Sequence, residues 1–135
     1  MKTFDFKQVQ MVNEQVQNID PTVLTASPQM CYETAIWAAT QRAYIGEQQA
    51  IAKNDWAANK VKHYSSFIAN NEANQKRVEK YGVMTVKDYI NAKCGDYEAR
   101  HEYCERTCAA LDSLQKSLMT IISSLKEEMR QSNFS

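Results

Sequence analysis

Three side chains with metal-binding chemistry recur along one face of the predicted C-terminal helix. His101, Cys104 and Cys108 lie at positions i, i+3 and i+7, and Cys94 precedes them. Thiolate and imidazole groups are ligands that Zn²⁺ prefers. However, structural zinc sites usually use closely spaced pairs on turns, and the sequence has no Cys-x-x-Cys pair. The three positions also belong to an apolar heptad pattern, in which cysteine packs as a small hydrophobe. The pattern favours core packing over a metal site.

The same residues fit nucleophilic catalysis poorly. A cysteine with a histidine three residues before it could form a thiolate pair. The sequence supplies no orienting third group, no oxyanion loop and no Gly-rich phosphate loop to accompany it. The carboxylates Glu127 and Glu128 lie between Lys126 and Arg130, as on a solvated helix face. We therefore predict a protein that uses no cofactor, catalyses no reaction and acts by binding other macromolecules.

A basic and aromatic stripe on the second predicted helix is the strongest candidate binding surface. Its members recur every three or four residues from Lys53 to Phe67 and so share one helix face. Lysines neutralise phosphates and aromatic rings stack on unpaired bases, which favours single-stranded nucleic acid as the ligand. The alternative is that Trp56 and Phe67 belong to the core while the lysines extend outward. The candidate contacts are Lys53, Trp56, Lys60, Lys62, His63 and Tyr64. A second basic cluster, Lys76, Arg77 and Lys80, either extends this surface or is an ordinary solvated loop.

Length and composition favour a single helical domain over residues 1–135. Three glycines and two prolines are too few for the many turns of a β-sandwich or barrel. Sixteen basic residues balance sixteen acidic ones, so nucleic-acid binding would require local clustering of charge. The N-terminus has no apolar secretory segment and no apolar stretch could span a bilayer, which predicts a cytoplasmic protein with free thiols and no membrane contact.

Two helices are expected in the N-terminal half of the chain. Apolar residues repeat every three or four positions over a short helix at 4–18. Ser27 and Pro28 are favourable starting residues for a long helix over 28–70. Two rows on the long helix are predicted to meet a neighbouring helix: Met30, Trp37, Tyr44, Ile51 and Ala58, and the small-residue row Ile36, Ala39, Ala43, Gly46, Ala50 and Ala57.

The C-terminal half is expected to contain a short helix over 86–94, beginning near Thr85, and a long helix over 97–131, capped by Asp96. The long helix has a heptad seam that it cannot bury alone. We therefore predict an all-α fold in which two long antiparallel helices form a coiled-coil-like bundle with short flanking helices, and the chain forms oligomers. The predicted oligomer contacts are Tyr97, Cys104, Leu111, Leu118, Ile122, Leu125 and Met129.

The order of these features resembles the UvsY-type recombination mediators of bacteriophages. The resemblance begins with Ile19-Asp20-x-Thr22-x-Leu24, and aromatic residues Tyr32 and Trp37 follow early in a long helix. It continues with Lys60-x-Lys62, closely followed by Tyr64, and ends with the long heptad helix. The family motif has paired tyrosines and then Ser-Gly, whereas Tyr64 here precedes Ser65-Ser66-Phe67, and Lys62 stands where arginine is expected.

The resemblance implies a non-enzymatic protein that acts in DNA recombination, repair and replication in the cytoplasm of an infected bacterial host. Such mediators bind single-stranded DNA as ring-like oligomers and help a RecA-like recombinase to replace single-strand-binding protein. By this resemblance, Lys60 and Lys62 would hold phosphates beside Tyr64, and the helix at 97–129 would supply the oligomer seam. The alternative, which zero net charge favours, is a helical protein–protein adaptor or inhibitor without nucleic-acid binding.

Overall fold

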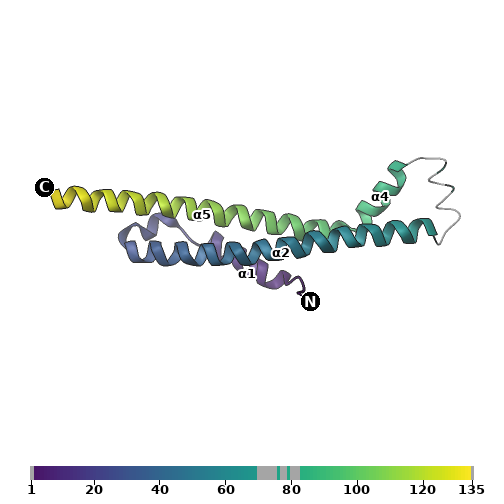
Figure 1. The fold of residues 1–135 in the computed structure, drawn as a ribbon, viewed down its shortest axis with the longest axis horizontal. Helices are drawn as coiled ribbons and strands as arrows, with labels where there is room; N and C mark the ends of the chain where they lie inside the picture. The colour runs from purple at the N-terminus through teal and green to yellow at the C-terminus, as the bar shows by residue number, and fades with distance from the viewer. Residues whose placement is uncertain (1, 70–75, 77–78, 80–82, 135) are drawn as a thin grey trace. The chain divides into compact units, whose positions relative to one another are not determined.

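A computed structural model describes residues 2–69, 76, 79 and 83–134 of the chain. Over these residues the chain forms helices and no strand, which confirms the all-α prediction. None of the described helices is both long and apolar enough to cross a membrane. The helices are α1 (Phe6–Gln17), the 3-10 helix η1 (Pro21–Ala26), α2 (Pro28–Ala69), α4 (Val83–Lys93) and α5 (Gly95–Phe134), as labelled in Figure 1.

The capping residue expected for α2 is confirmed, whereas those expected for α4 and α5 are wrong. Helix α4 already begins at Val83, so Thr85 lies within it. The Ser27 hydroxyl accepts a hydrogen bond from the Met30 amide at 3.3 Å, so Ser27 caps α2 as predicted. Asp5 caps α1 in the same way, through the Gln8 amide. Asp96 does not cap α5, because the helix already begins at Gly95. Its carboxylate instead lies in the first turn, where the helix dipole favours negative charge.

Contacts within the chain define two compact units, described here separately. Unit 1 consists of residues 1–4 and 49–103, and unit 2 consists of residues 5–48 and 104–135. Unit 1 therefore contains the C-terminal part of α2, the helix α4 and the beginning of α5. Unit 2 contains α1, η1, the N-terminal part of α2 and most of α5. The single-domain assignment stays a prediction.

In unit 2 the helices α2 and α5 run antiparallel. The Arg42 guanidinium pairs with Asp112 at 3.0 Å. Ten residues earlier on α2, the Tyr32 ring lies 5.8 Å from the Lys126 ammonium, which is later on α5. Residues nearer the start of α2 therefore contact residues nearer the end of α5. The two helices are antiparallel, as predicted, and Figure 1 shows this arrangement.

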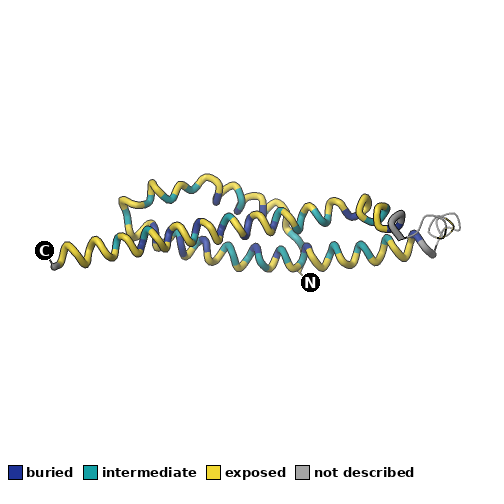
Figure 2. Tube along the Cα trace, turned by 90° about the horizontal axis from the view of Figure 1, so that it is seen from above, coloured by how far each residue is buried: buried dark blue, intermediate teal, exposed yellow. Residues whose placement is uncertain are grey.

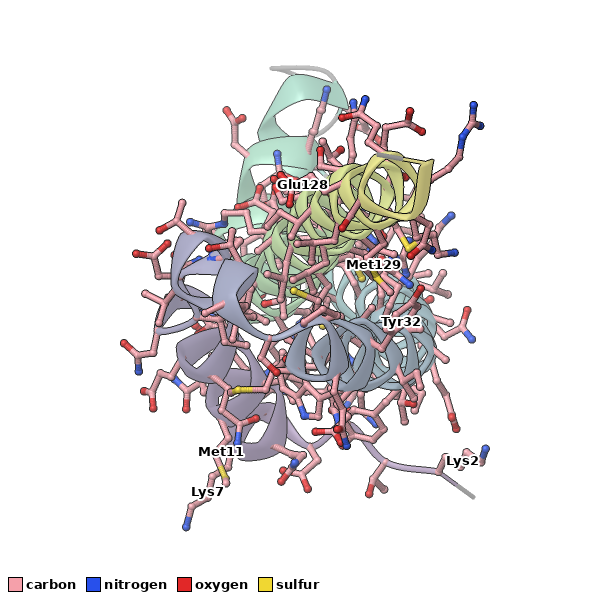
Figure 3. All side chains as sticks on the ribbon, turned by 90° about the vertical axis from the view of Figure 1, so that its left-hand side faces the viewer. Lys2, Lys7, Met11, Tyr32, Glu128 and Met129 are labelled. Carbon is pink, nitrogen blue, oxygen red and sulfur yellow. The ribbon has the colours of Figure 1, made fainter. Side chains whose placement is uncertain are left out.

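Helix α1 completes the core of unit 2. The Asp5 amide donates a hydrogen bond to the Gln48 side chain at 2.8 Å, and the Thr107 hydroxyl donates to Asn13 at 3.4 Å. Lys7 and Met11 point outward from α1 in Figure 3, so the opposite face of the helix packs inward. The apolar core of this unit comprises Val9, Val12, Val16, Cys31, Ala35, Ala38, Ile45, Cys104, Cys108, Leu111, Leu114, Leu118 and Ile122.

The face that α2 buries is not the one predicted. Ile36, from the small-residue row, is 67% exposed, and Met30, from the other row, is 51% exposed. Alanines 39, 43, 50, 57 and 58 of these rows are also exposed. Ala38 and Ile45 are buried instead, at heptad spacing. Figure 2 shows such buried positions alternating with exposed ones along the helices. The small-residue row is wrong except at Gly46, which is partly buried, and the other row is correct in part, since Trp37, Tyr44 and Ile51 are partly buried. Because α2 carries apolar residues on more than one face, periodicity alone does not identify the buried one.

Two pairs of aromatic rings contribute to the packing of unit 1. Phe67 of α2 lies 4.6 Å from Tyr89 of α4, measured between ring centroids, and is almost completely buried. Trp56 of α2 lies 5.8 Å from His101 of α5. Such tilted ring pairs stabilise packing by about 0.5–1.5 kcal/mol beyond the area that they bury. They fix α4 and the start of α5 against the C-terminal part of α2.

Candidate nucleic-acid interface

The basic and aromatic stripe of α2 divides into a packed part and a solvated part. Phe67 is only 4% exposed, so the alternative of core packing holds for this residue. Trp56 and His63 are partly buried, and Trp56 contacts His101. Lys53 is exposed. The stripe therefore follows the edge of the helix interface, where Trp56, His63 and Phe67 are at least partly buried and Lys53 is solvated.

Lys60 is held over the ring of Trp56. Its Nζ atom lies 3.7 Å from the ring centroid, which is a close cation–π contact. Because the indole face attracts the ammonium group, the contact restricts the long lysine side chain without neutralising its charge. Trp56 thereby gives Lys60 a defined place at the border between the packed and solvated parts of α2.

A groove between α2 and α4 gathers Lys60 with six further residues of unit 1. Its volume is about 450 Å³. Lys60, Val61 and Tyr64 line it from α2. Both Val61 and Tyr64 are exposed, at 65% and 50%. The contribution of α4 consists of Val86, Lys87, Ile90 and Asn91. We call this site the α2–α4 groove.

The α2–α4 groove combines positive charge with an apolar surface. Lys60 and Lys87 contribute ammonium groups, and the lining residues that the structure describes include no carboxylate. Two such cations attract phosphate oxygens, and an exposed tyrosine ring provides a stacking surface for an unpaired base. The groove can therefore contact both the phosphate and the base of a nucleotide.

The contribution of α4 to the groove was missed by the sequence analysis. Lys87 and Asn91 are one turn apart on α4, as are Val86 and Ile90. This spacing was visible as an amphipathic pattern on a short helix. The pattern did not indicate that α4 would lie against α2, because the Phe67–Tyr89 contact that joins them is made between distant parts of the sequence.

Lys62 does not line the groove with Lys60. Residues two apart on an α-helix point about 200° from each other, so the pair cannot share a face. Lys62 is exposed, and so is Lys76 of the second basic cluster. Arg77 and Lys80 lie outside the described residues. Of the predicted DNA contacts, the structure brings together Lys60 and Tyr64 in the groove, with Trp56 supporting Lys60.

The cysteines are buried thiols. All four are free and buried. Burial, reinforced by the neighbouring Cys108, raises the pKa of Cys104 to about 11, and burial likewise raises the pKa of Cys108. Protonated thiols are weak nucleophiles and weak metal ligands. Within the described part of the chain, no three His, Cys, Asp or Glu side chains are grouped to hold a metal ion.

The predicted oligomer seam is largely covered within the chain itself. Leu111 and Leu118 are fully buried, and Ile122 nearly so. Cys104 is also buried, whereas Tyr97 and Leu125 are partly exposed. Met129, near the end of α5, is 62% exposed. The exposed end of the seam is therefore the part that remains accessible to a second copy.

Comparisons with known protein families, with curated proteins and with solved structures found no match to this chain.

Proposed function

We propose that this chain is a recombination mediator, which binds single-stranded DNA in the α2–α4 groove and assists a RecA-like recombinase in replacing single-strand-binding protein. The observation that carries the proposal is the grouping of Lys60 and Tyr64, from the basic-aromatic motif of α2, with Lys87 of α4. Neither helix alone provides two cations beside an exposed ring at this site. The resemblance to UvsY-type mediators supplies the recombination role.

The chemistry of the groove favours single-stranded over double-stranded DNA. Lys60 and Lys87 would neutralise phosphates in either form. The half-exposed ring of Tyr64, however, offers a stacking face that only an unpaired base can use. In a duplex, the faces of the bases are covered by their neighbours in the stack. The tyrosine therefore contributes to binding only when the strand is single.

A neutral chain can bind DNA in this way because its charge is locally segregated. The formal net charge is zero, yet the described lining of the groove carries two lysines and no acidic residue. Each groove would bind weakly by itself. Several grooves in one oligomer would bind one strand much more tightly by raising its effective concentration. Weak individual contacts also suit a protein that transfers its strand to a recombinase, because each contact can be exchanged separately.

The experiment compares two double variants that remove the same charge. Lys60→Ala/Lys87→Ala removes both groove cations, whereas Lys116→Ala/Lys7→Ala removes two exposed lysines outside the groove. Affinity for a fluorescent oligothymidine is measured by anisotropy. Since charge-assisted hydrogen bonds each contribute about 1.5–3 kcal/mol and the groove variant loses two, we expect it to bind at least about a hundredfold more weakly. The control variant should bind nearly as the wild type does.

The salt dependence gives a second readout of the same variants. Loss of two phosphate contacts to a single strand should make the slope of log affinity against log salt shallower by about 1.4. Circular dichroism and sedimentation check that fold and assembly are retained. Equal losses in both variants would show general attraction to a charged surface and would contradict binding in the groove. No binding by the wild type at low salt would favour the adaptor hypothesis.

A further inference from the structure

We infer that the α2–α4 groove is an insertion site for one unpaired base of the bound strand, with the flanking phosphates on Lys60 and Lys87. This inference rests on the proposed function and concerns the part of the strand that the groove recognises. It assigns a role to the apolar surface of Val61, Val86 and Ile90, which phosphate binding leaves unused.

The apolar part of the groove is unsuited to phosphate. Val86 forms a nearly buried floor, and Ile90 is partly buried. Val61 stands at the edge, with 65% of its surface exposed to solvent. A phosphate placed against these side chains would lose water without gaining hydrogen bonds there. A ligand that uses the whole groove must therefore carry an uncharged, largely apolar group close to negative charge.

A nucleobase joined to its phosphates has this combination. The groove volume of about 450 Å³ lies within the range of sites that bind small molecules, about 300–1,000 Å³. Extruded bases are held between aromatic and apolar side chains in proteins that act on them. Here the ring of Tyr64 would lie beside one face of the base, and the aliphatic floor would cover the other.

Asn91 adds a polar group at the same site. Its side-chain amide has one acceptor oxygen and two donor hydrogens, so it can hydrogen-bond the edge of any base. A flat ring with a polar edge therefore matches Tyr64 and Asn91 together. An aliphatic side chain from a protein partner would fill the floor of the groove but would leave the Asn91 amide without a hydrogen-bonding ligand group.

The test compares two labelled strands of equal length and charge: oligothymidine, and an abasic deoxyribose-phosphate strand. Because base contacts are worth about 1–3 kcal/mol each, the wild type should bind the abasic strand roughly tenfold more weakly. Val61→Asn should weaken binding of oligothymidine and leave binding of the abasic strand unchanged. Ile36→Asn is the matched control, since Ile36 is a β-branched residue of α2 that is equally exposed, at 67% against 65%, and lies outside the groove.

The outcomes separate this inference from the proposed function. Equal affinity of the wild type for the two strands would overturn base insertion and leave phosphate binding intact. Absence of binding to both strands would instead remove the proposed function. If Val61→Asn fails to fold, 2-aminopurine in the strand gives a readout with the unaltered chain. Its fluorescence should fall on binding as it stacks on Tyr64, and unchanged fluorescence with the strand bound would overturn the inference. If base insertion is overturned by equal affinities or by unchanged fluorescence, the apolar groove would become a candidate site for the side chain of a protein partner.

Discussion

The pKa of the Cys104 thiol lies well above its ordinary value because α5 places this side chain in the buried core. Burial and the adjacent Cys108 raise its pKa from 9.0 to about 11. In the unfolded chain the same thiol would ionise near 9.0. The folded state therefore binds the proton more tightly than the unfolded state does. This preference stabilises the fold fully below pH 9.0, and the contribution is lost as pH rises toward about 11.

Cys104→Ala should remove this part of the pH dependence. Urea unfolding of the wild type, followed at several pH values, should show the free energy of unfolding falling between pH 9.0 and about 11. The variant is less stable at neutral pH, because a buried side chain is shortened. Its free energy should nevertheless fall less steeply over that pH range. Parallel curves for the two proteins would contradict the raised pKa of Cys104.

At the scale of residues, the sequence predicts two members of the candidate site, Lys60 and Tyr64, and none from α4. Lys60 and Tyr64 stand out because cations and aromatic rings recur together on one helix. Lys87 and Asn91 do not, since their relevance depends on a contact between α2 and α4 that no local pattern specifies. Lys62 is adjacent to Lys60 in the motif, yet the helical rotation of about 200° takes it out of the groove. Side-chain direction therefore limits what a motif can predict.

At the scale of elements, helix boundaries were more predictable than helix faces. Ser27 and Pro28 mark the start of α2 through local hydrogen bonding and fixed backbone geometry. Both effects depend only on residue type and can be predicted from the sequence. The buried face of α2 depends on its partners. Small residues at Ala35 and Ala38 are buried in the same core as the large side chains of α5, while the equally small Ala39 and Ala43 are exposed.

Two isoleucines of α2 test this assignment of faces. Ile45 is fully buried, whereas Ile36 is largely exposed on the same helix. Ile45→Ala should lower the free energy of unfolding by about 2–5 kcal/mol, because it leaves a cavity in the core. Ile36→Ala should change it by only about 0.5 kcal/mol or less. Urea denaturation of both variants gives the comparison. A larger loss for Ile36→Ala would reverse the assignment and restore the small-residue row as the packed face.

At the scale of the whole molecule, composition and the proposed function point in different directions. Equal numbers of acidic and basic residues give no sign of nucleic-acid binding, and the groove owes its positive charge to local placement. The all-α fold follows from composition and periodicity, whereas the number of copies in an assembly does not. The buried Leu111 and Leu118 are enclosed within one chain, so any ring-like assembly would have to use other surfaces, such as the end of α5 near Met129.

The most direct test of the central claim is the affinity of the unaltered protein for a fluorescent oligothymidine at low and high salt. Anisotropy at about 50 and 200 mM salt gives the slope of log affinity against log salt. Two phosphate contacts in the α2–α4 groove predict a slope of about −1.4 or steeper. Binding that weakens in this way supports phosphate recognition, which the comparison of Lys60→Ala/Lys87→Ala with its control then assigns to the groove. Undetectable binding at low salt, or an affinity that does not change with salt, would contradict the account.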